Sequence, residues 1–348
     1  MTASSAERAA MVRALELARS PGVPLGPNPR VGCVLLDPAG TTVSEGFHRG
    51  AGTPHAEVDA LTRAGDRAHG ATAVVTLEPC NHTGRTGPCS RAIVEAGVVR
   101  VVFAQADTNL VATGGVDTLR AAAVDVEGGL LADEARLVNR AWTFAVTHGR
   151  PFVTWKLATT LDGRSAAADG TSRWVSSLPA RRDTHRLRAL SDAILAGTGT
   201  VLVDDPQLTV RDQDDVPLPP ERQPLRAVMG LRDLPLGRRV LDDAAGTVLL
   251  RTRDPREALA RLTELDRQHV FLEGGPTLAA AFLEAGLVDE VVCYVAPLLL
   301  GSGSSSVGDL GIGSIGDALH LDVTDVTVLG DGSETNVRLT LTPLKETA

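Results

Sequence analysis

The sequence predicts a two-domain α/β protein. Its 348 residues are enough for two domains of ordinary size, and 43% of them are hydrophobic, enough to build a core in each. In both halves, short apolar runs bounded by glycine or proline alternate with helical patterns. One helical pattern ends at His148 and Gly149, with Pro151 beyond them. We therefore expect domains of residues 1–148 and 149–348.

The first half is expected to open with a helix. Ser4 and Glu7 form a capping-box pattern, and an apolar stripe then runs from Ala10 to Ala18. Strands are expected at residues 31–36, 73–77 and 98–104. Further helices are expected to begin near residues 55 and 89 and to cover 132–146. This order predicts an α/β sandwich with residues 78–80 just past a strand end, where such sheets commonly place their sites.

The second half is expected to begin with an apolar strand at residues 151–158. Further strand candidates follow at residues 192–197, 225–229, 247–251, 269–273 and 290–295. Two loops are expected, one rich in Asp and Pro at 211–224 and one rich in Gly and Ser at 301–316. Residues 311–316 match G-x-G-x-x-G, but no strand precedes them and no long helix follows. We therefore reject a dinucleotide-binding turn there.

A zinc-type pattern stands in the first half. His55, Cys80 and Cys89 supply three ligands, which leaves the fourth tetrahedral position of a catalytic zinc for water. Glu57 is not needed as a ligand and can move protons. Zinc deaminases of nucleobase-like rings carry H-x-E and then P-C-x-x-C, whereas eight residues separate the cysteines here. Pro88 predicts that Cys89 begins a helix, whose positive end favours a thiolate.

A chance origin of this pattern is the alternative. H-x-E is common, and buried cysteines are often core residues. Cys33 and Cys293 lie in strand-like runs and fit that description, whereas Cys80 and Cys89 lie in polar or helix-start sequence. Four cysteines, with neither a signal peptide nor a long apolar run, indicate a reduced cytoplasmic protein rather than a disulfide framework or a membrane protein.

The net charge of -9 and an aromatic content of 3% argue against a nucleic-acid substrate, which demands a positive surface and stacking platforms. One basic pocket could still bind a single phosphate. Two glycine-rich turns, at residues 196–200 and 273–278, follow expected strands. They suggest a nucleotide cleft with backbone N–H groups for a phosphate, although an ordinary strand-to-helix turn is an equally open interpretation. Nearby arginines could clamp a phosphate or simply be solvated: Arg181, Arg182, Arg186, Arg188 and Arg211.

Longer motifs run nearly from end to end. The first half contains Asn28-Pro29-Arg30-Val31-Gly32, His55-Ala56-Glu57, Glu78-Pro79-Cys80 and Gly84-Arg85-Thr86-x-Pro88-Cys89. The second half contains Leu161-Asp162-Gly163-Arg164, Trp174-Val175-Ser176-Ser177, Thr200-Val201-Leu202-x-Asp204-Asp205-Pro206, Leu208-Thr209-Val210-Arg211 and Glu273-Gly274-Gly275-Pro276-Thr277-Leu278. With these motifs the chain resembles the bifunctional deaminase-reductases of riboflavin biosynthesis, long cysteine spacing included.

The resemblance implies a cytidine-deaminase-like α/β/α sandwich followed by a dihydrofolate-reductase-like α/β domain. The first domain would bind one Zn²⁺ per chain and deaminate 2,5-diamino-6-(5-phosphoribosylamino)pyrimidin-4-one, with Glu57 as the proton carrier. The second would use NADPH to reduce the ribosyl side chain of 5-amino-6-(5-phosphoribosylamino)uracil to ribityl. It also implies a homo-oligomer, dimer or tetramer, that binds small phosphorylated pyrimidines.

The resemblance also assigns residues. Those expected to bind NADPH are Ala158, Trp174, Thr200, Asp204, Gly275, Pro276, Thr277, Leu278, Ala279, Ala280 and Ala281. Those expected to bind substrate are Asn28 and His48 in the deaminase and Ser172, Arg188, Leu208, Arg211 and Glu273 in the reductase. Lys156 is a site residue of open role.

The chain departs from the family pattern at two places. Asp107-Thr108-Asn109-Leu110 stands where D-P-N-P is frequent, and Gly230-Leu231 where an Asp-Ser pair is frequent. The second departure falls at the adenosine end of the cofactor and leaves the preference for NADPH over NADH open. Arg232 is a candidate to bind the extra phosphate that NADPH carries and NADH lacks.

Other functions remain as alternatives. One domain could be inactive and purely structural. A nucleic-acid deaminase is disfavoured by the acidic charge, and a zinc-containing binding module by the spare carboxylate of Glu57.

Overall fold

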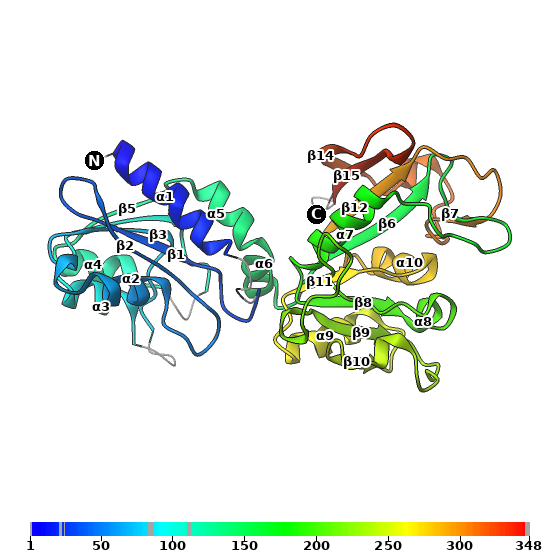
Figure 1. The fold of residues 1–348 in the computed structure, drawn as a ribbon, viewed down its shortest axis with the longest axis horizontal. Coiled ribbons are helices and arrows are strands. Elements are labelled where there is room, and N and C mark those ends of the chain that lie inside the picture. The colour runs from blue at the N-terminus through cyan, green and yellow to red at the C-terminus, as the bar shows by residue number, and fades with distance from the viewer. Residues whose placement is uncertain (1, 21–22, 24, 83–86, 110–112, 345–348) are drawn as a thin grey trace. The chain divides into compact units, whose positions relative to one another are not determined.

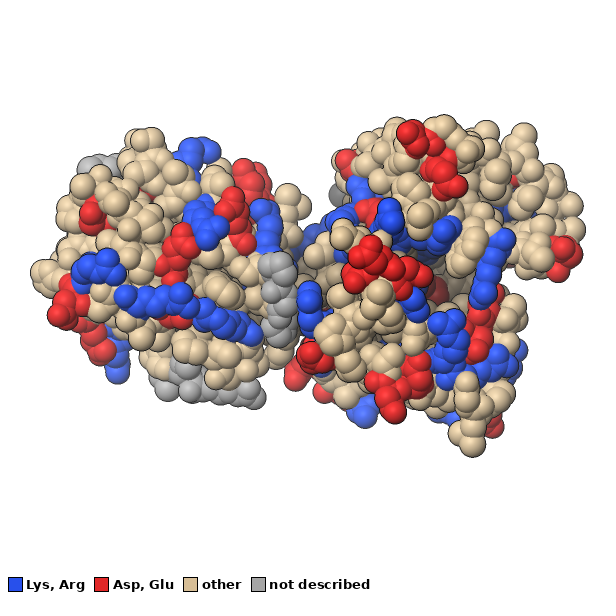
Figure 2. All heavy atoms as spheres, viewed as in Figure 1, with Lys and Arg blue, Asp and Glu red and all other residues tan. Residues whose placement is uncertain are grey.

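The computed structural model describes residues 2–20, 23, 25–82, 87–109 and 113–344, and it separates into two compact units after Gly149 (Figure 1). Four residues of the quoted motifs, Gly84, Arg85, Thr86 and Leu110, lie outside the described ranges. Within those ranges, no helix has the length and apolarity needed to cross a membrane. On the face that Figure 2 shows, basic and acidic side chains are interspersed over both units rather than separated by sign.

The first unit is built on a five-stranded sheet of order β2-β1-β3-β4-β5. Its strands are β1 (Gly32–Leu36), β2 (Thr42–Phe47), β3 (Thr72–Leu77), β4 (Arg100–Gln105) and β5 (Asp125–Gly128). β1 runs antiparallel to both of its neighbours, whereas β3, β4 and β5 are parallel to one another. The three predicted strands are therefore present with bounds shifted by at most two residues, and β2 and β5 are additional.

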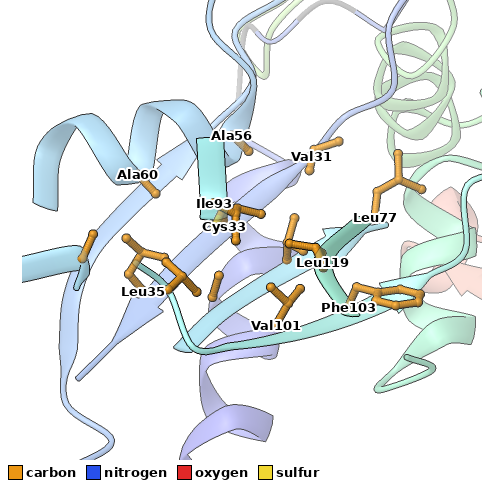
Figure 3. Packing of buried hydrophobic residues seen from close by; sticks show 14 of the residues in the cluster. Val31, Cys33, Leu35, Ala56, Ala60, Leu77, Ile93, Val101, Phe103 and Leu119 are labelled. Carbon is orange, nitrogen blue, oxygen red and sulfur yellow. The ribbon is translucent and has the colours of Figure 1, made fainter. Parts of the chain in front are cut away.

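Helices cover both faces of this sheet. They are α1 (Ser5–Ala18), α2 (Ala56–Ala64), α3 (Cys89–Glu95), α4 (Gly115–Ala121), α5 (Ala132–Val138) and α6 (Arg140–His148). Side chains alternate along β1, so Cys33 and Leu35 pack with residues of α2, α3 and α4 (Figure 3), and Val34 and Leu36 pack with α1 and α5. The predicted α/β/α sandwich is confirmed.

Local sequence explains why these elements meet so closely. The capping box at the start of α1 is present, with Ser4 and Glu7 bonding each other's backbone N–H. A Cβ atom at position 32 would lie 2.0 Å from the carbonyl oxygen of Ala14. Only glycine allows β1 and α1 to approach this closely.

The prediction of one helix over residues 132–146 is wrong. Asn139 leaves helical geometry with φ of −110°, and the chain continues as a separate helix, α6. The Asn139 side chain accepts from the backbone N–H of Arg30 over 2.8 Å and donates to the carbonyl of Arg30 over 2.9 Å. These two hydrogen bonds to a distant residue accompany the interruption of the helix at Asn139. No local pattern in residues 132–146 indicates this interruption.

The second unit contains an eight-stranded sheet of order β10-β9-β8-β11-β6-β12-β15-β14. Its strands are β6 (Phe152–Thr160), β8 (Ala193–Gly197), β9 (Leu225–Met229), β10 (Thr247–Leu250), β11 (His269–Leu272), β12 (Glu290–Ala296), β14 (Leu321–Leu329) and β15 (Asn336–Pro343). The six predicted strands form the parallel part of this sheet. β14 and β15 form an antiparallel hairpin at one edge and are not among the predicted strands.

Four α-helices belong to the described part of the second unit: α7 (Leu178–Arg188), α8 (Thr198–Asp204), α9 (Pro255–Glu264) and α10 (Pro276–Glu284). Leu195 and Leu272 of the sheet belong to the same buried cluster as residues of α9 and α10, while Ile194 and Phe271 face a second cluster with Val201 of α8. α8 follows β8 directly and α10 follows β11, so both glycine-rich turns lie at the carboxyl ends of neighbouring strands. Two short strands, β7 (Arg164–Ala166) and β13 (Ser304–Ser305), pair outside the main sheet.

Candidate active sites

The three predicted zinc ligands lie together in the first unit. Nδ1 of His55 is 3.2 Å from Sγ of Cys89 and 3.6 Å from Sγ of Cys80, and the three ligand atoms all lie within 4.8 Å of one another. His55 is the N-cap of α2, Cys80 follows β3, and Cys89 is the first residue of α3. One nitrogen and two sulfur donors at these separations suit a tetrahedral zinc ion with one further position.

The helix starts at this site agree with the prediction to within one residue. α2 begins at Ala56, so His55 stands at its N-cap with extended backbone. Pro88 is the N-cap of α3, and Cys89 begins that helix as predicted. Both ligands therefore project from helix N-termini. The expected preference of Cys89 for the thiolate is not seen, because its contact with Cys80 and its burial raise its pKa.

The two cysteines interact directly. The backbone N–H of Cys89 points at Sγ of Cys80 over 3.5 Å. A side-chain hydrogen bond from Cys89 lowers the pKa of Cys80 to about 4, and the same contact raises the pKa of Cys89 well above its usual value. The two sulfurs thus compete for one proton, and a dication bound by both would take the place of that proton.

Glu57 lies in the first turn of α2, with 4% of its surface exposed. Burial raises its pKa to about 7, and the nearby Cys80 adds to the rise. A carboxyl group with a pKa near neutrality can both take up and release a proton, which a general acid-base requires.

Asn28 and His48 form a hydrogen-bonded pair beside His55. Nδ1 of His48 lies 3.0 Å from the carbonyl oxygen of Pro54, which can only accept, so Nδ1 carries the proton. Nε2 then accepts from Nδ2 of Asn28 over 2.9 Å. Burial lowers the pKa of His48 and keeps its ring neutral. The His48 and His55 rings meet edge to face with centroids 5.3 Å apart.

Asn81 is a residue that sequence reasoning missed. Its Oδ1 accepts from the hydroxyls of Ser90, over 2.7 Å, and Thr118, over 3.0 Å. It therefore ties the chain after Cys80 to α3 and α4, and the backbone N–H of Ser90 adds a bond to the carbonyl of Cys80 over 3.2 Å. Its position next to Cys80 is the sole sequence signal for this role.

In the second unit, Arg188 and Glu273 form a bidentate ion pair. Nη2 of Arg188 is 2.8 Å from Oε2 of Glu273, and Nε pairs with Oε1, while Nη1 donates to the carbonyl of Thr209 over 2.7 Å. Burial raises the pKa of Glu273, but Arg188 outweighs burial and holds it below the usual value. Lys156 lies in the same charged group, since burial lowers its pKa and the Glu273 carboxylate opposes that.

Arg211 lies close to this group. Its backbone N–H donates to Nδ1 of His185 over 3.2 Å, and its guanidinium bonds Gln207 and the carbonyl of Asp215. Leu208, three residues before it, is buried with φ of +53°. Ser172 lies in the segment before α7, and in the described residues no side-chain hydrogen bond connects it to Arg188 or Arg211.

The residues expected to bind a nucleotide cofactor lie along the carboxyl ends of the strands. Ala158 is on β6, Thr200 and Asp204 are on α8, and residues 275–281 span the N-cap and first turns of α10. A Cβ atom on Gly275 would lie 4.0 Å from Oγ1 of Thr200, so these two segments are neighbours. No side chain caps the N-terminus of α10. Pro276 has no N–H and the N–H of Leu278 donates to the carbonyl of Gly275 over 3.1 Å, so in this first turn the N–H of Thr277 is left for an anion.

Two further groups flank this region. Trp174 is 64% exposed, and the guanidinium of Arg181 lies 4.5 Å from its ring centroid. Arg232 is exposed, and its Nη2 would lie 2.9 Å from a Cβ atom on Gly199. Gly230 has φ of +142°, and a Cβ atom there would lie 2.5 Å from Oγ1 of Thr198, which explains why this chain has glycine at that position.

Comparison with protein families gives two matches that together span most of the chain. Residues 4–105 match the cytidine and deoxycytidylate deaminase zinc-binding region, and residues 151–334 match the RibD C-terminal domain. The chain is 52% identical over 305 residues to the riboflavin biosynthesis protein RibD of Mycobacterium tuberculosis strain H37Rv, covering 87% of this chain and 89% of that protein. It is 41% identical to RibD of Escherichia coli K12, covering 92% and 96%.

Solved structures agree with these matches. Acinetobacter baumannii RibD, form 1, superposes with a TM-score of 0.86 at 38% identity, covering 98% of this chain and 99% of that one. A Thermotoga maritima protein named diaminohydroxyphosphoribosylaminopyrimidine deaminase/5-amino-6-(5-phosphoribosylamino)uracil reductase superposes with a TM-score of 0.86 at 31% identity, covering 97% and 99%.

Proposed function

Because this chain belongs to the RibD family of bifunctional riboflavin biosynthesis enzymes, we propose that its two domains perform successive steps on one phosphorylated pyrimidine. The chain is a deaminase and reductase, with a zinc-binding deaminase domain and an NADPH-using reductase domain. Residues 1–148 would deaminate 2,5-diamino-6-(5-phosphoribosylamino)pyrimidin-4-one. Residues 149–348 would reduce the ribosyl side chain of 5-amino-6-(5-phosphoribosylamino)uracil to ribityl.

In the deaminase, His55, Cys80 and Cys89 would hold the zinc ion, which when bound supplies an activated water at neutral pH. Glu57 would take one proton from the attacking water and give it to the ring nitrogen. It would then take the second proton from the new hydroxyl on the ring carbon and give it to the departing amine, so the C–N bond breaks, a ring carbonyl forms and ammonia leaves. Asn28 and His48 would orient the ring. Support comes from the neutral tautomer of His48, which turns the Asn28 amide nitrogen toward His48 and its oxygen away, as an acceptor for substrate.

In the reductase, NADPH supplies hydride, and the protein binds and orients both partners. Ala158, Trp174, Thr200, Asp204 and the start of α10 would hold the cofactor, with the N–H of Thr277 on its pyrophosphate. Arg188, Glu273, Leu208, Arg211 and Ser172 would hold the substrate. The guanidinium of Arg211 suits the substrate phosphate, because arginine matches phosphate geometry with parallel N–H donors. Lys156 stays without an assigned role.

The convergence of His55, Cys80 and Cys89 beside the buried Glu57 is the observation that carries this proposal. The test is to incubate the purified, zinc-loaded chain with the diaminopyrimidine substrate, with and without NADPH. Ammonia release in both cases, and ribityl product only with NADPH, is the expected result. Deamination without any NADPH-dependent ribityl product would refute the bifunctional assignment and leave a deaminase with a structural second domain.

We further propose that the chain forms a homo-oligomer in the cytoplasm. β14 is an edge strand and exposes Val323, Val326 and Val328, each by more than half of its surface. Unpaired edge strands with apolar side chains favour pairing with another chain. All four cysteines are free, as in a reducing compartment. Light scattering on the purified protein would give the number of chains, and a monomer at micromolar concentration would contradict the first part.

A further inference from the structure

The guanidinium of Arg211 is held by the protein on two sides. Its Nη1 donates to the backbone carbonyl of Asp215 over 2.7 Å, and its Nη2 donates to Oε1 of Gln207 over 2.9 Å. Arginine has five N–H donors in one plane. Two anchored donors fix the direction of that plane, so the orientation in which Arg211 meets a ligand depends on Gln207.

The side-chain amide of Gln207 can take only one orientation. Its Nε2 donates to Oδ2 of Asp242 over 2.7 Å. An ionised carboxylate accepts and cannot donate, so the NH₂ group must face Asp242 and the carbonyl oxygen must face Arg211. Burial raises the pKa of Asp242, but hydrogen bonds from Arg226 and Gln207 outweigh burial and hold the pKa below its usual value.

Asp242 is fixed in turn by Arg226 of β9. The Arg226 side chain is completely buried, and its Nη1 donates to Oδ1 of Asp242 over 2.7 Å. The same Nη1 reaches the backbone carbonyl of Gln207 over 3.3 Å, and Nε donates to the hydroxyl of Thr247 over 2.9 Å. The series Arg226, Asp242, Gln207, Arg211 therefore begins on a strand inside the sheet, and each hydrogen bond fixes the next side chain.

We propose that Gln207 is a positioning residue of the reductase, which orients Arg211 to bind the phosphate of the phosphoribosyl substrate. This rests on the proposed function, in which Arg211 is the group that contacts substrate. Gln207 is half-buried, and its carbonyl oxygen is turned to Arg211 rather than to a phosphate, whose oxygens need donors. The motif that identifies the reductase leaves position 207 unspecified, between Pro206 and Leu208.

The test is a double-mutant cycle with Gln207→Leu, Arg211→Leu and the combined variant, assayed on the phosphorylated reductase substrate at saturating NADPH. Losing one hydrogen bond to a charged group should raise the KM of Gln207→Leu about five- to tenfold, with kcat within about twofold of wild type. Arg211→Leu should raise KM roughly thirtyfold or more. In the Arg211→Leu background the second substitution should have no effect.

Gln213→Leu is the matched control. Gln213 lies in the same loop and is exposed, and its side chain has no hydrogen bond within the described residues. Its kinetics should equal those of wild type. The KM for NADPH and the deaminase rate should be the same in all variants, and thermal unfolding should show that each is folded.

Three results would overturn the inference. Additive effects on KM in the double variant would mean that Gln207 contacts the substrate itself. An equal fall of kcat in both backgrounds, with a lower melting temperature, would mean that Gln207 only stabilises the loop. An inactive wild-type reductase would overturn the proposed function and this inference with it, whereas an active wild type with either of the first two results overturns the inference alone.

Discussion

Arg188 and Glu273 pair through two parallel hydrogen bonds, although one residue ends α7 and the other follows β11. Both side chains are mostly buried, with 14% and 13% of their surfaces exposed. Each charge is balanced by its partner, which is the condition for keeping two ions out of water. The pair therefore joins a helix to the sheet at the point where the reductase substrate is expected.

Glu273→Gln should destabilise the second unit by about 3–5 kcal/mol, because it leaves the Arg188 charge buried without a counter-ion. The free energy of unfolding from urea titrations measures this. Glu264→Gln is the control, since Glu264 pairs with Arg261 on the exposed side of α9. That substitution should cost less than about 1 kcal/mol. Equal effects of the two variants would show that the Arg188 charge is solvated.

Glu57→Gln should keep the zinc ion but lower the deamination rate by about 10²–10⁴-fold, the usual contribution of a general acid-base. The substitution conserves shape and removes only the ability to carry a proton. Metal analysis and an ammonia assay on the same preparation check the two parts. Normal ammonia release would show that another group moves the proton.

Cys89→Ser should lose zinc, because a hydroxyl is a poor substitute for a thiolate ligand. Cys293→Ser serves as the control, since Cys293 lies on β12 in the second unit and its zinc content should match the wild type. Full zinc retention by Cys89→Ser would indicate a different third ligand, with His82 as the nearest candidate along the chain.

His185 should make the second unit sensitive to acid. Burial, with a contribution from Arg188, lowers the pKa of His185 to about 4, and its Nδ1 accepts from the backbone N–H of Arg211. A depressed folded-state pKa stabilises the fold above the unfolded value of about 6.5, and this stability is lost as the pH falls from 6.5 to 4. The loss is at most roughly 3 kcal/mol at pH 4.

The measurement for His185 compares the free energy of unfolding of wild type and His185→Gln across this pH range. Glutamine does not titrate, so the difference between the two curves should change between pH 6.5 and pH 4 and be constant above pH 7. Parallel curves throughout would contradict the assignment.

Arg232→Ala should raise the KM for NADPH about tenfold and leave the KM for NADH unchanged, if Arg232 reads the phosphate that distinguishes the two cofactors. Its guanidinium lies over the turn at Gly199, next to the predicted cofactor residue Thr200. Arg222→Ala, at an exposed position in a short 3-10 helix, is the control. A parallel change of both KM values would show that Arg232 does not discriminate between the cofactors.

Much of the fold follows from local sequence. Buried parallel strands such as β8 and β11 are short apolar runs that end in glycine-rich turns, so they can be predicted directly. β14 could not be predicted in this way, because most of its residues are exposed and a bulge between Val323 and Asp325 interrupts the alternation of its valines. The end of α5 at Asn139 depends on a distant partner, Arg30.

The residues of the candidate sites likewise divide into those that the sequence predicts and those that it does not. The zinc ligands could be found because His and Cys are rare residue types in this chain, and because their spacing, with Glu57 two residues after His55, indicates a zinc site. Asn81 and Gln207 could not, because an amide acquires its role only from the groups that the fold brings to its two ends. The resemblance to a family supplied the remaining reductase positions.

The interruption of the helix at Asn139 limits how the protein could be engineered for thermal stability. A ranking of positions by helix propensity would select Asn139 for replacement by alanine. That change would favour one continuous helix but would remove both hydrogen bonds to the backbone of Arg30, which lies two residues from Asn28. The substitution would therefore loosen the segment that carries Asn28, the residue proposed to orient the pyrimidine, so Asn139 is a position to keep although it lies outside both helices.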